Sequence, residues 1–252
     1  MDKVWRHGQF VWREMLCPDV AKAKGFYGEL FGWTFADMPM GPMTYTIISA
    51  GSRQVGGIMP STPQMGPPAW LSYVSVKDAD ETVRAAEAGG GKLPMGVQSA
   101  PGVGRFGVVN DPTGGYVGFL QGESASDPAG MPAAGEFCWE TLNTTDIEKA
   151  KAFYATLFGW TAAAGPGGNM NVFSAGETQV ADVEPAQPGM PSHWLAHVVV
   201  AKLEPARERA EKLGAKVFVP VIDIPQVGRV CIIQDPVGAV ISLFEPGMPA
   251  AS

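Results

Sequence analysis

The chain has 252 residues, of which 46% are apolar and 17% charged, and its net charge at pH 7 is −7. These values are typical of a globular protein of one or two domains and exclude a disordered chain. An acidic chain without a block of Lys or Arg is unsuited to nucleic acid, and no apolar run approaches the roughly 20 residues of a membrane span.

The first half of the chain predicts alternating strands and helices. Asp19 can cap a helix whose apolar residues follow at helical spacing until Gly32, and a second helix is predicted over 78–89. Strands are predicted at 70–76 and 106–109 because β-branched and aromatic residues are concentrated there. The sequence Asp-Pro-x-Gly at 111–114 is typical of a turn between strands.

The second half repeats the first. Residues 137–161 are identical to residues 10–34 at thirteen of 25 positions, and the Asp-Pro-x-Gly turn returns at 235–238. Helices are therefore predicted over 146–159 and 204–214, and strands over 194–200 and 230–233. Pro-rich stretches at 60–68 and 184–192 divide each copy again. We expect an α+β fold of four βαβββ modules.

The repeat also predicts the domain boundaries. The first domain covers residues 1–122, a Gly/Pro/Ser-rich linker covers 123–135, and the second domain covers 136–252. Residues 1–7 have no apolar core of a signal peptide, and the three cysteines are far apart and odd in number. These features predict a cytoplasmic protein without a disulfide framework.

Two motifs resemble a known family. They are W-x-E-x-x-x-x-D-x-x-x-A-x-x-F-Y-x-x-L-F-G-W at 12–33, echoed at 139–160, and G-R-x-x-x-x-x-D-P-x-G at 104–114 and 228–238. Both resemble the vicinal oxygen chelate superfamily of glyoxalases, bleomycin resistance proteins and dioxygenases. The duplicated length is similar to its metal-poor, glyoxalase-like members. The resemblance implies curved sheets around a cup, where active members hold a divalent metal through His, Glu or Gln.

The resemblance also implies where the metal ligands would lie. These positions hold Trp12, Leu71 and Gly118 in the first copy and Trp139, Leu195 and Ser242 in the second. Tryptophan, leucine and glycine side chains do not ligate a divalent cation, and serine is a poor ligand. We therefore predict no metal and no other cofactor, with a divalent metal as the less favoured alternative.

Aromatic side chains take the place of the metal ligands. Trp12, Tyr73, Trp139 and His197 are the predicted ligand-binding residues, and they suit a small apolar or aromatic molecule. His197 is also a candidate metal ligand or general base, but its alignment with Tyr73 favours a pocket-lining role. His193 would share its face at a distance of roughly 13 Å, which is too far for one ion. The remaining aromatic residues of the two motifs are predicted to be core.

Charged residues supply the other candidates. Glu14 could be a base with a raised pKa, or it could pair with a backbone or Arg group, and the sequence leaves both open. The second copy has Thr141 at the position equivalent to Glu14, and its Glu140 is one residue out of register with Glu14. Arg105 and Arg229 could anchor an acidic ligand, but a loop-fixing salt bridge is favoured. Glu245 is expected to be exposed.

These observations predict a protein that binds a small apolar or aromatic molecule in a largely metal-free cup. The alternatives are a metal-dependent lyase, isomerase or dioxygenase, and a metal-free enzyme that uses a carboxylate base. The catalytic candidates in those cases are His197 with Glu14 or Glu140. The expected partner is a small molecule rather than nucleic acid or a membrane, and the expected state is a monomer or homodimer.

Overall fold

The computed structural model describes residues 4–125, 130–165 and 171–247. The first copy begins with a module of one strand, one helix and three strands: β1 (Phe10–Cys17), α1 (Val20–Phe31), β2 (Thr34–Met40), β3 (Met43–Ala50) and β4 (Arg53–Pro60). After a short 3₁₀ turn, η1 (Pro63–Met65), the second module repeats the order: β5 (Ala69–Ser75), α2 (Ala79–Ala88), β6 (Lys92–Ala100), β7 (Gly104–Asn110) and β8 (Tyr116–Gly122).

The second copy has the same order of elements. Its third module consists of β9 (Phe137–Thr144), α3 (Ile147–Phe158), β10 (Thr161–Ala164), β11 (Asn171–Ala175) and β12 (Thr178–Pro185). Its fourth consists of β13 (His193–Val199), α4 (Leu203–Lys212), β14 (Lys216–Ile224), β15 (Gly228–Gln234) and β16 (Val240–Pro246). The predicted helices and strands are confirmed to within two or three residues at their ends.

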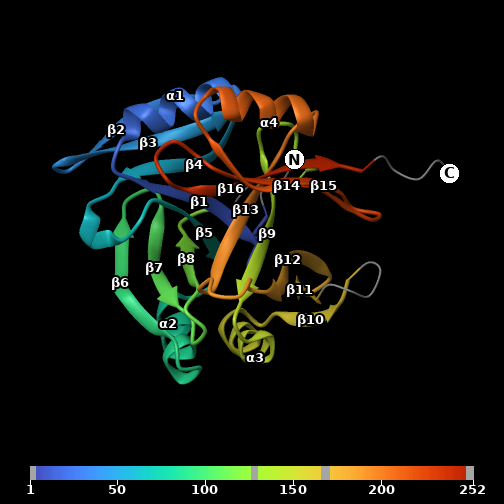
Figure 1. Cartoon of the computed structure of the whole chain (residues 1–252). Helices are drawn as coiled ribbons and strands as arrows, with labels where there is room; N and C mark the ends of the chain where they lie inside the picture. Colours follow the sequence, from blue (N-terminus) through green and yellow to red (C-terminus); the bar gives the residue numbers. More distant parts are fainter. Residues whose placement is uncertain (1–3, 126–129, 166–170, 248–252) are drawn as a thin grey trace. The chain divides into compact units, whose positions relative to one another are not determined.

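The described strands form two eight-stranded sheets, one from each copy (Figure 1). The strand orders are β2-β3-β4-β1-β5-β8-β7-β6 and β10-β11-β12-β9-β13-β16-β15-β14. In both sheets the first strand of a module pairs in parallel with its last strand, as β1 does with β4 and β13 with β16. The predicted α+β fold of four βαβββ modules in two curved sheets is confirmed.

Contacts divide the chain into two compact units that differ from the two copies. Unit 1 contains residues 1–12, 71–130 and 140–194, and unit 2 contains residues 13–70, 131–139 and 195–252. Unit 1 thus combines the second and third modules, and unit 2 combines the first and fourth. The domain boundaries at 1–122 and 136–252 stay a prediction. So does the linker 123–135, of which residues 126–129 lie outside the described residues.

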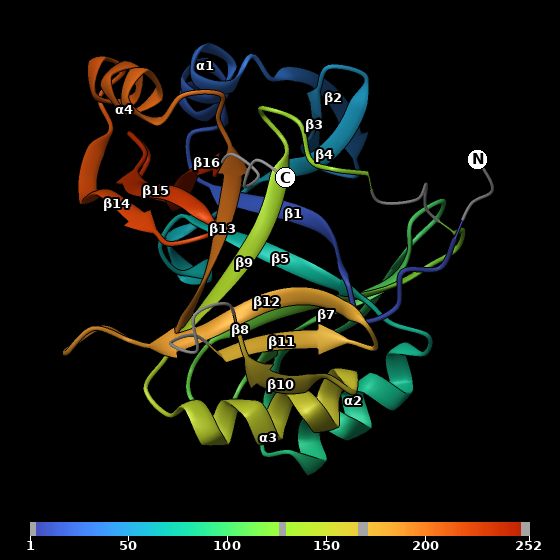
Figure 2. The same cartoon turned by 90° about the vertical axis from the view of Figure 1, so that its right-hand side faces the viewer.

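Helices α1 and α3 begin and end where their caps predict. The carboxylate of Asp19 accepts a hydrogen bond of 3.0 Å from the backbone N–H of Lys22, and Gly32 ends α1 in the left-handed conformation with φ of 71°. Asp146 and Gly159 cap α3 in the same way. Within unit 2, α1 and α4 pack together, and within unit 1, α2 and α3 do so (Figure 2).

Each unit has its own apolar core. In unit 2, Tyr27 and Trp33 are buried with Ile233 of β15. In unit 1, Tyr154 and Trp160 are buried with Phe119 of β8. The predicted core role of the motif aromatics is confirmed, with only Phe31 and Phe158 partly exposed. None of the helices in the described part of the chain has the length and apolar character needed to cross a membrane.

Candidate functional site

Alternation along each strand separates two faces. On one face, Met15 and Cys17 of β1 pack against Phe26 of α1. We call the opposite face of each sheet the cup face. It carries Glu14 and Leu16, the residues of β1 on either side of Met15, because successive strand side chains point in opposite directions.

The cup face of unit 1 carries a separate apolar cluster. Leu71, Tyr73 and Val108 are buried together, and the partly buried side chains that pack against them are Trp12, Met95, Phe106 and Leu120. The rings of Tyr73 and Phe106 meet edge to face, with centroids 6.5 Å apart. The predicted ligand-binding residues Trp12 and Tyr73 therefore belong to one apolar surface.

The ring of Tyr73 fills the space above Gly118. The two residues are strand neighbours in register, and a Cβ atom built at position 118 would overlap the Tyr73 ring. No side chain larger than hydrogen fits there without moving that ring. Because Gly118 is the position of the expected last-strand metal ligand, the first copy does not fit the metal site that the resemblance implies.

The second copy has a polar pair at the equivalent place, within unit 2. His197 is the strand neighbour of Ser242, as Tyr73 is of Gly118. His197 is 8% exposed, and burial lowers its pKa from 6.5 to about 4, so the imidazole is neutral near pH 7. The thiol of Cys138 donates a hydrogen bond of 3.5 Å to the backbone carbonyl of His197.

Ser242 is fully buried on the cup face of β16. Its hydroxyl has no hydrogen-bond partner among the residues that the structure describes. The expected ligand positions of the second copy hold Trp139, Leu195 and Ser242. With His197 beside them, they offer one imidazole and one hydroxyl, which do not fit a metal site with three protein ligands. In the described ranges 4–125, 130–165 and 171–247, no three His, Cys, Asp or Glu residues are grouped for a metal ion.

Glu14 lies on the cup face of unit 2. Its strand neighbour on β4 is Gly57, and a Cβ atom at position 57 would overlap the hydroxyl of Tyr45. The phenol of Tyr45 thus lies over Gly57, next to the strand position of Glu14. Glu14 is only 9% exposed, so its side chain is largely shielded from water.

The second copy places its carboxylate on the neighbouring strand. Thr141 replaces Glu14, and its hydroxyl donates a hydrogen bond of 2.9 Å to the buried carboxylate of Asp182 on β12. Asp182 was not among the predicted site residues. Aligning RQVGGIMP at 53–60 with TQVADVEP at 178–185 would have found it, because this alignment places Asp182 opposite Gly57.

Glu140 and His193 do not join these groups. Glu140 is fully buried, and it points away from the cup face because it alternates with Thr141 along β9. His193 is partly exposed, and its Nδ1 lies 2.9 Å from the backbone carbonyl oxygen of Pro191.

The charged residues of the second motif fix helix ends. Arg105 forms a bidentate pair with Asp80, and Arg229 pairs with Glu204, so the salt-bridge interpretation of both arginines is confirmed. The expected exposure of Glu245 is wrong. Its side chain is 14% exposed, because its carboxylate accepts hydrogen bonds from Leu203 N–H and Arg229, and these bonds lower its pKa to about 2.

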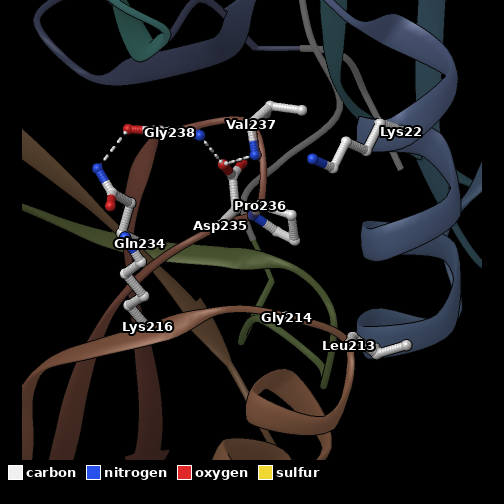
Figure 3. Close-up of a pocket in the computed structure, with 9 residues that line it drawn as sticks. All are labelled: Lys22, Leu213, Gly214, Lys216, Gln234, Asp235, Pro236, Val237 and Gly238. Carbon is white, nitrogen blue, oxygen red and sulfur yellow. Dashed lines mark hydrogen bonds between the residues drawn. The ribbon is translucent and has the colours of Figure 1, made fainter.

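A shallow pocket of about 470 Å³ opens at the second Asp-Pro-x-Gly turn in unit 2 (Figure 3). Lys22 of α1 extends toward Val237 at its edge, and Lys216 and Gln234 line the opposite side. The carboxylate of Asp235 does not face a ligand, because it accepts hydrogen bonds from the backbone of the turn and from Tyr27. The pocket is apart from the cup face and holds no candidate chemistry of its own.

Comparisons with known proteins agree with this fold. A family model described as "Glyoxalase/Bleomycin resistance protein/Dioxygenase superfamily" matches residues 9–119 and 137–243. "Putative glyoxylase CFP32" of Mycobacterium bovis is 32% identical over 251 residues, which cover 96% of each chain. "Anthracycline biosynthesis protein DnrV" of Streptomyces peucetius is 30% identical over 271 residues, covering 97% of this chain and 96% of DnrV.

Solved structures share the fold at low sequence identity. The Mn(II)-bound glyoxalase from Novosphingobium aromaticivorans has a TM-score of 0.64 and 13% identity, with 96% of this chain and 83% of that chain covered. The 2,3-dioxygenase LapB from Pseudomonas sp. KL28 has a TM-score of 0.66 and 10% identity, with 95% of this chain and 92% of that chain covered. At these identities the likeness concerns the fold alone.

Proposed function

The chain belongs to the glyoxalase/bleomycin resistance protein/dioxygenase superfamily, and on that premise we propose that it binds a small apolar or aromatic molecule on its cup faces without a metal ion. The observation that carries this proposal is the ring of Tyr73 over Gly118, within a cluster that includes Leu71 and Trp12. Aromatic and aliphatic groups take up the space that a metal and its ligands would need. Such a surface gains free energy by covering an apolar ligand.

A relative supports an aromatic ligand. DnrV is named for anthracycline biosynthesis, and anthracyclines are flat, fused-ring compounds. A flat ring system matches the apolar cluster that includes Trp12, Tyr73 and Phe106, in which the rings of Tyr73 and Phe106 meet edge to face. In the second copy, the neutral imidazole of His197 and the hydroxyl of Ser242 would add polar groups that orient the ligand.

Two measurements on protein purified without chelator test the proposal. Elemental analysis is expected to find less than stoichiometric metal, and titration with a neutral polycyclic probe such as anthracene is expected to quench tryptophan fluorescence. Replacing Trp12 or Trp139 by Ala should weaken probe binding, while Ala at the exposed Trp5 should not. Stoichiometric metal would replace the proposal with a metal-dependent lyase, isomerase or dioxygenase. Unchanged affinity in both cup-face variants would contradict the assignment of the binding site to the cup faces.

The partner in this proposal is the small molecule itself. A monomer or homodimer is the expected state, and sedimentation analysis with and without the probe would distinguish the two.

A further inference from the structure

Ser242 of β16 buries a hydroxyl that the described part of the chain does not satisfy. The residue is 0% exposed, and its Oγ atom has no hydrogen-bond partner within 4–125, 130–165 and 171–247. Buried polar groups are nearly always hydrogen-bonded, because their transfer out of water without a partner costs free energy. A hydroxyl that breaks this rule in a native fold needs an explanation, and a ligand that supplies the partner is one.

Other buried hydroxyls of the chain show that the fold can satisfy such groups. Ser192 in unit 1 is 4% exposed, and its Oγ accepts a hydrogen bond of 3.0 Å from the backbone N–H of Thr145. Thr46 in unit 2 is 1% exposed, and its hydroxyl donates a hydrogen bond of 2.6 Å to the carboxylate of Asp37. The state of Ser242 is therefore particular to its place on the cup face.

The surroundings of Ser242 on that face are uncharged. Strand register places His197 of β13 on one side of it and Ile232 of β15 on the other. Val240 and Phe244 lie two residues before and after it on the same face of β16. Ile232, Val240 and Phe244 are partly exposed, and burial lowers the pKa of His197 so that its imidazole is neutral near pH 7. A neutral ligand suits this surface, because an ion would lose its hydration there.

The chemistry of the hydroxyl indicates what the ligand must offer. A serine hydroxyl has one donor hydrogen and two acceptor lone pairs, and a buried donor without an acceptor is the rarer kind of unsatisfied group. The first copy has no such donor at this position, since Gly118 stands there beneath the ring of Tyr73. The two copies thus differ by one hydrogen-bond donor at equivalent positions.

We propose that the cup face of the second copy selects neutral flat ligands that carry a carbonyl oxygen, with the Ser242 hydroxyl as the donor to that oxygen. This inference rests on the proposed function and specifies the ligand class of one copy. Because the hydroxyl is covered, the ligand reaches it when the side chain of Ile232 or Phe244 changes rotamer, a fast motion at partly exposed positions. The hydrogen bond then forms in a low-dielectric setting, where it is strong.

The binding test compares two neutral probes with the same ring system, anthracene and 9,10-anthraquinone, which differ by two carbonyl oxygens. Both are titrated into the full-length protein and followed by tryptophan fluorescence. Ser242→Ala should weaken anthraquinone binding by about tenfold, because the donor is lost, and should leave anthracene binding unchanged. The control Ser192→Ala removes a buried hydroxyl outside the cup face of the second copy and should change the affinity for neither probe.

Urea denaturation of the same variants separates a binding role from a structural one. Ser242→Ala should raise the urea midpoint, because it removes an unsatisfied buried group, whereas Ser192→Ala should lower it, because it leaves the N–H of Thr145 without its acceptor. A lower midpoint for Ser242→Ala, equal loss of both probes, or unchanged anthraquinone binding would overturn this inference alone. Failure of anthracene to bind the wild type would overturn the proposed function itself.

Discussion

The hydroxyl of Tyr27 donates a hydrogen bond of 2.7 Å to the carboxylate of Asp235, which lies 208 residues later in the chain. The indole N–H of Trp70 donates to the same hydroxyl at 2.9 Å. All three side chains are buried, and burial raises the pKa of Asp235 and that of Tyr27. A residue of the first repeat thus completes the turn of the second repeat within unit 2.

The same arrangement recurs in unit 1. Tyr154 donates a hydrogen bond of 2.7 Å to Asp111, and Trp194 donates to Tyr154 at 2.9 Å. The aspartate of the Asp-Pro-x-Gly motif therefore has two roles. One carboxylate oxygen accepts hydrogen bonds from the backbone N–H groups of the turn, and the other accepts a hydrogen bond from the tyrosine hydroxyl. Each unit depends on residues from both copies.

We expect Tyr27→Phe to lower the free energy of unfolding by about 1–3 kcal/mol, because it leaves the buried Asp235 carboxylate and the Trp70 indole without the shared hydroxyl. Urea denaturation followed by tryptophan fluorescence measures this loss. Tyr116→Phe is the matched control, since Tyr116 is 53% exposed. Equal stability of the two variants would contradict the structural role of the Tyr27 hydrogen bond.

Separating the repeats tests the domain boundaries directly. The core of unit 2 mixes Phe26 of the first copy with Ile241 of the second, and the indole of Trp33 donates to the carbonyl of Gly135 at 2.6 Å. We therefore expect residues 1–122 and 136–252, expressed apart, to be unfolded or to self-associate, because each exposes core surface. Mixing them should restore native circular dichroism and urea resistance. A stable monomeric half would show instead that the boundaries define independent domains.

The sequence predicted the modules because their signals are local. The Asp19 cap, the helical spacing of apolar residues and the Gly32 stop act within about fifteen residues, so one sequence suffices to place α1. The pairing of Tyr27 with Asp235 could not be predicted in this way, since the local sequence around either residue does not indicate its distant partner. The role of Glu245 was missed for the same reason, because its partner Leu203 lies 42 residues away.

The candidate site was predictable in part. Position 73 was found because it aligns with His197, and the structure shows that both occupy the same register. Asp182 and Tyr45 were missed because no family motif marks them, and their relation to the cup face depends on strand register. A shift of one residue would move either side chain to the opposite face.

His197 should make stability depend on pH. Its folded-state pKa is about 4, below the ordinary value of 6.5, so the unfolded chain binds the proton first as the pH falls. The contribution of the neutral His197 to the free energy of unfolding is fully present above pH 6.5. It is lost as the pH falls from 6.5 to about 4, by up to about 3 kcal/mol. Urea midpoints measured across this range should fall in the wild type more steeply than in His197→Gln.

The comparison with His197→Gln isolates the imidazole from other groups. Asp235, whose pKa is raised by burial, acts with the opposite sign, since its contribution is present at low pH and is lost as the pH rises. It is present in both proteins and cancels in the difference. Parallel pH profiles for the two proteins would mean that His197 is not buried as a neutral group.

The exchange of Tyr73-Gly118 for His197-Ser242 between the copies predicts that the two positions are coupled. Gly118→Ser alone should destabilise the protein by about 1–3 kcal/mol, because the new Cβ overlaps the Tyr73 ring. Tyr73→His alone removes ring contacts within the apolar cluster of unit 1. The double variant copies the pair of the second repeat and should be more stable than the sum of the single losses by about 0.5–3 kcal/mol. Urea denaturation of all four proteins measures this coupling, and strictly additive losses would show that the two residues vary independently.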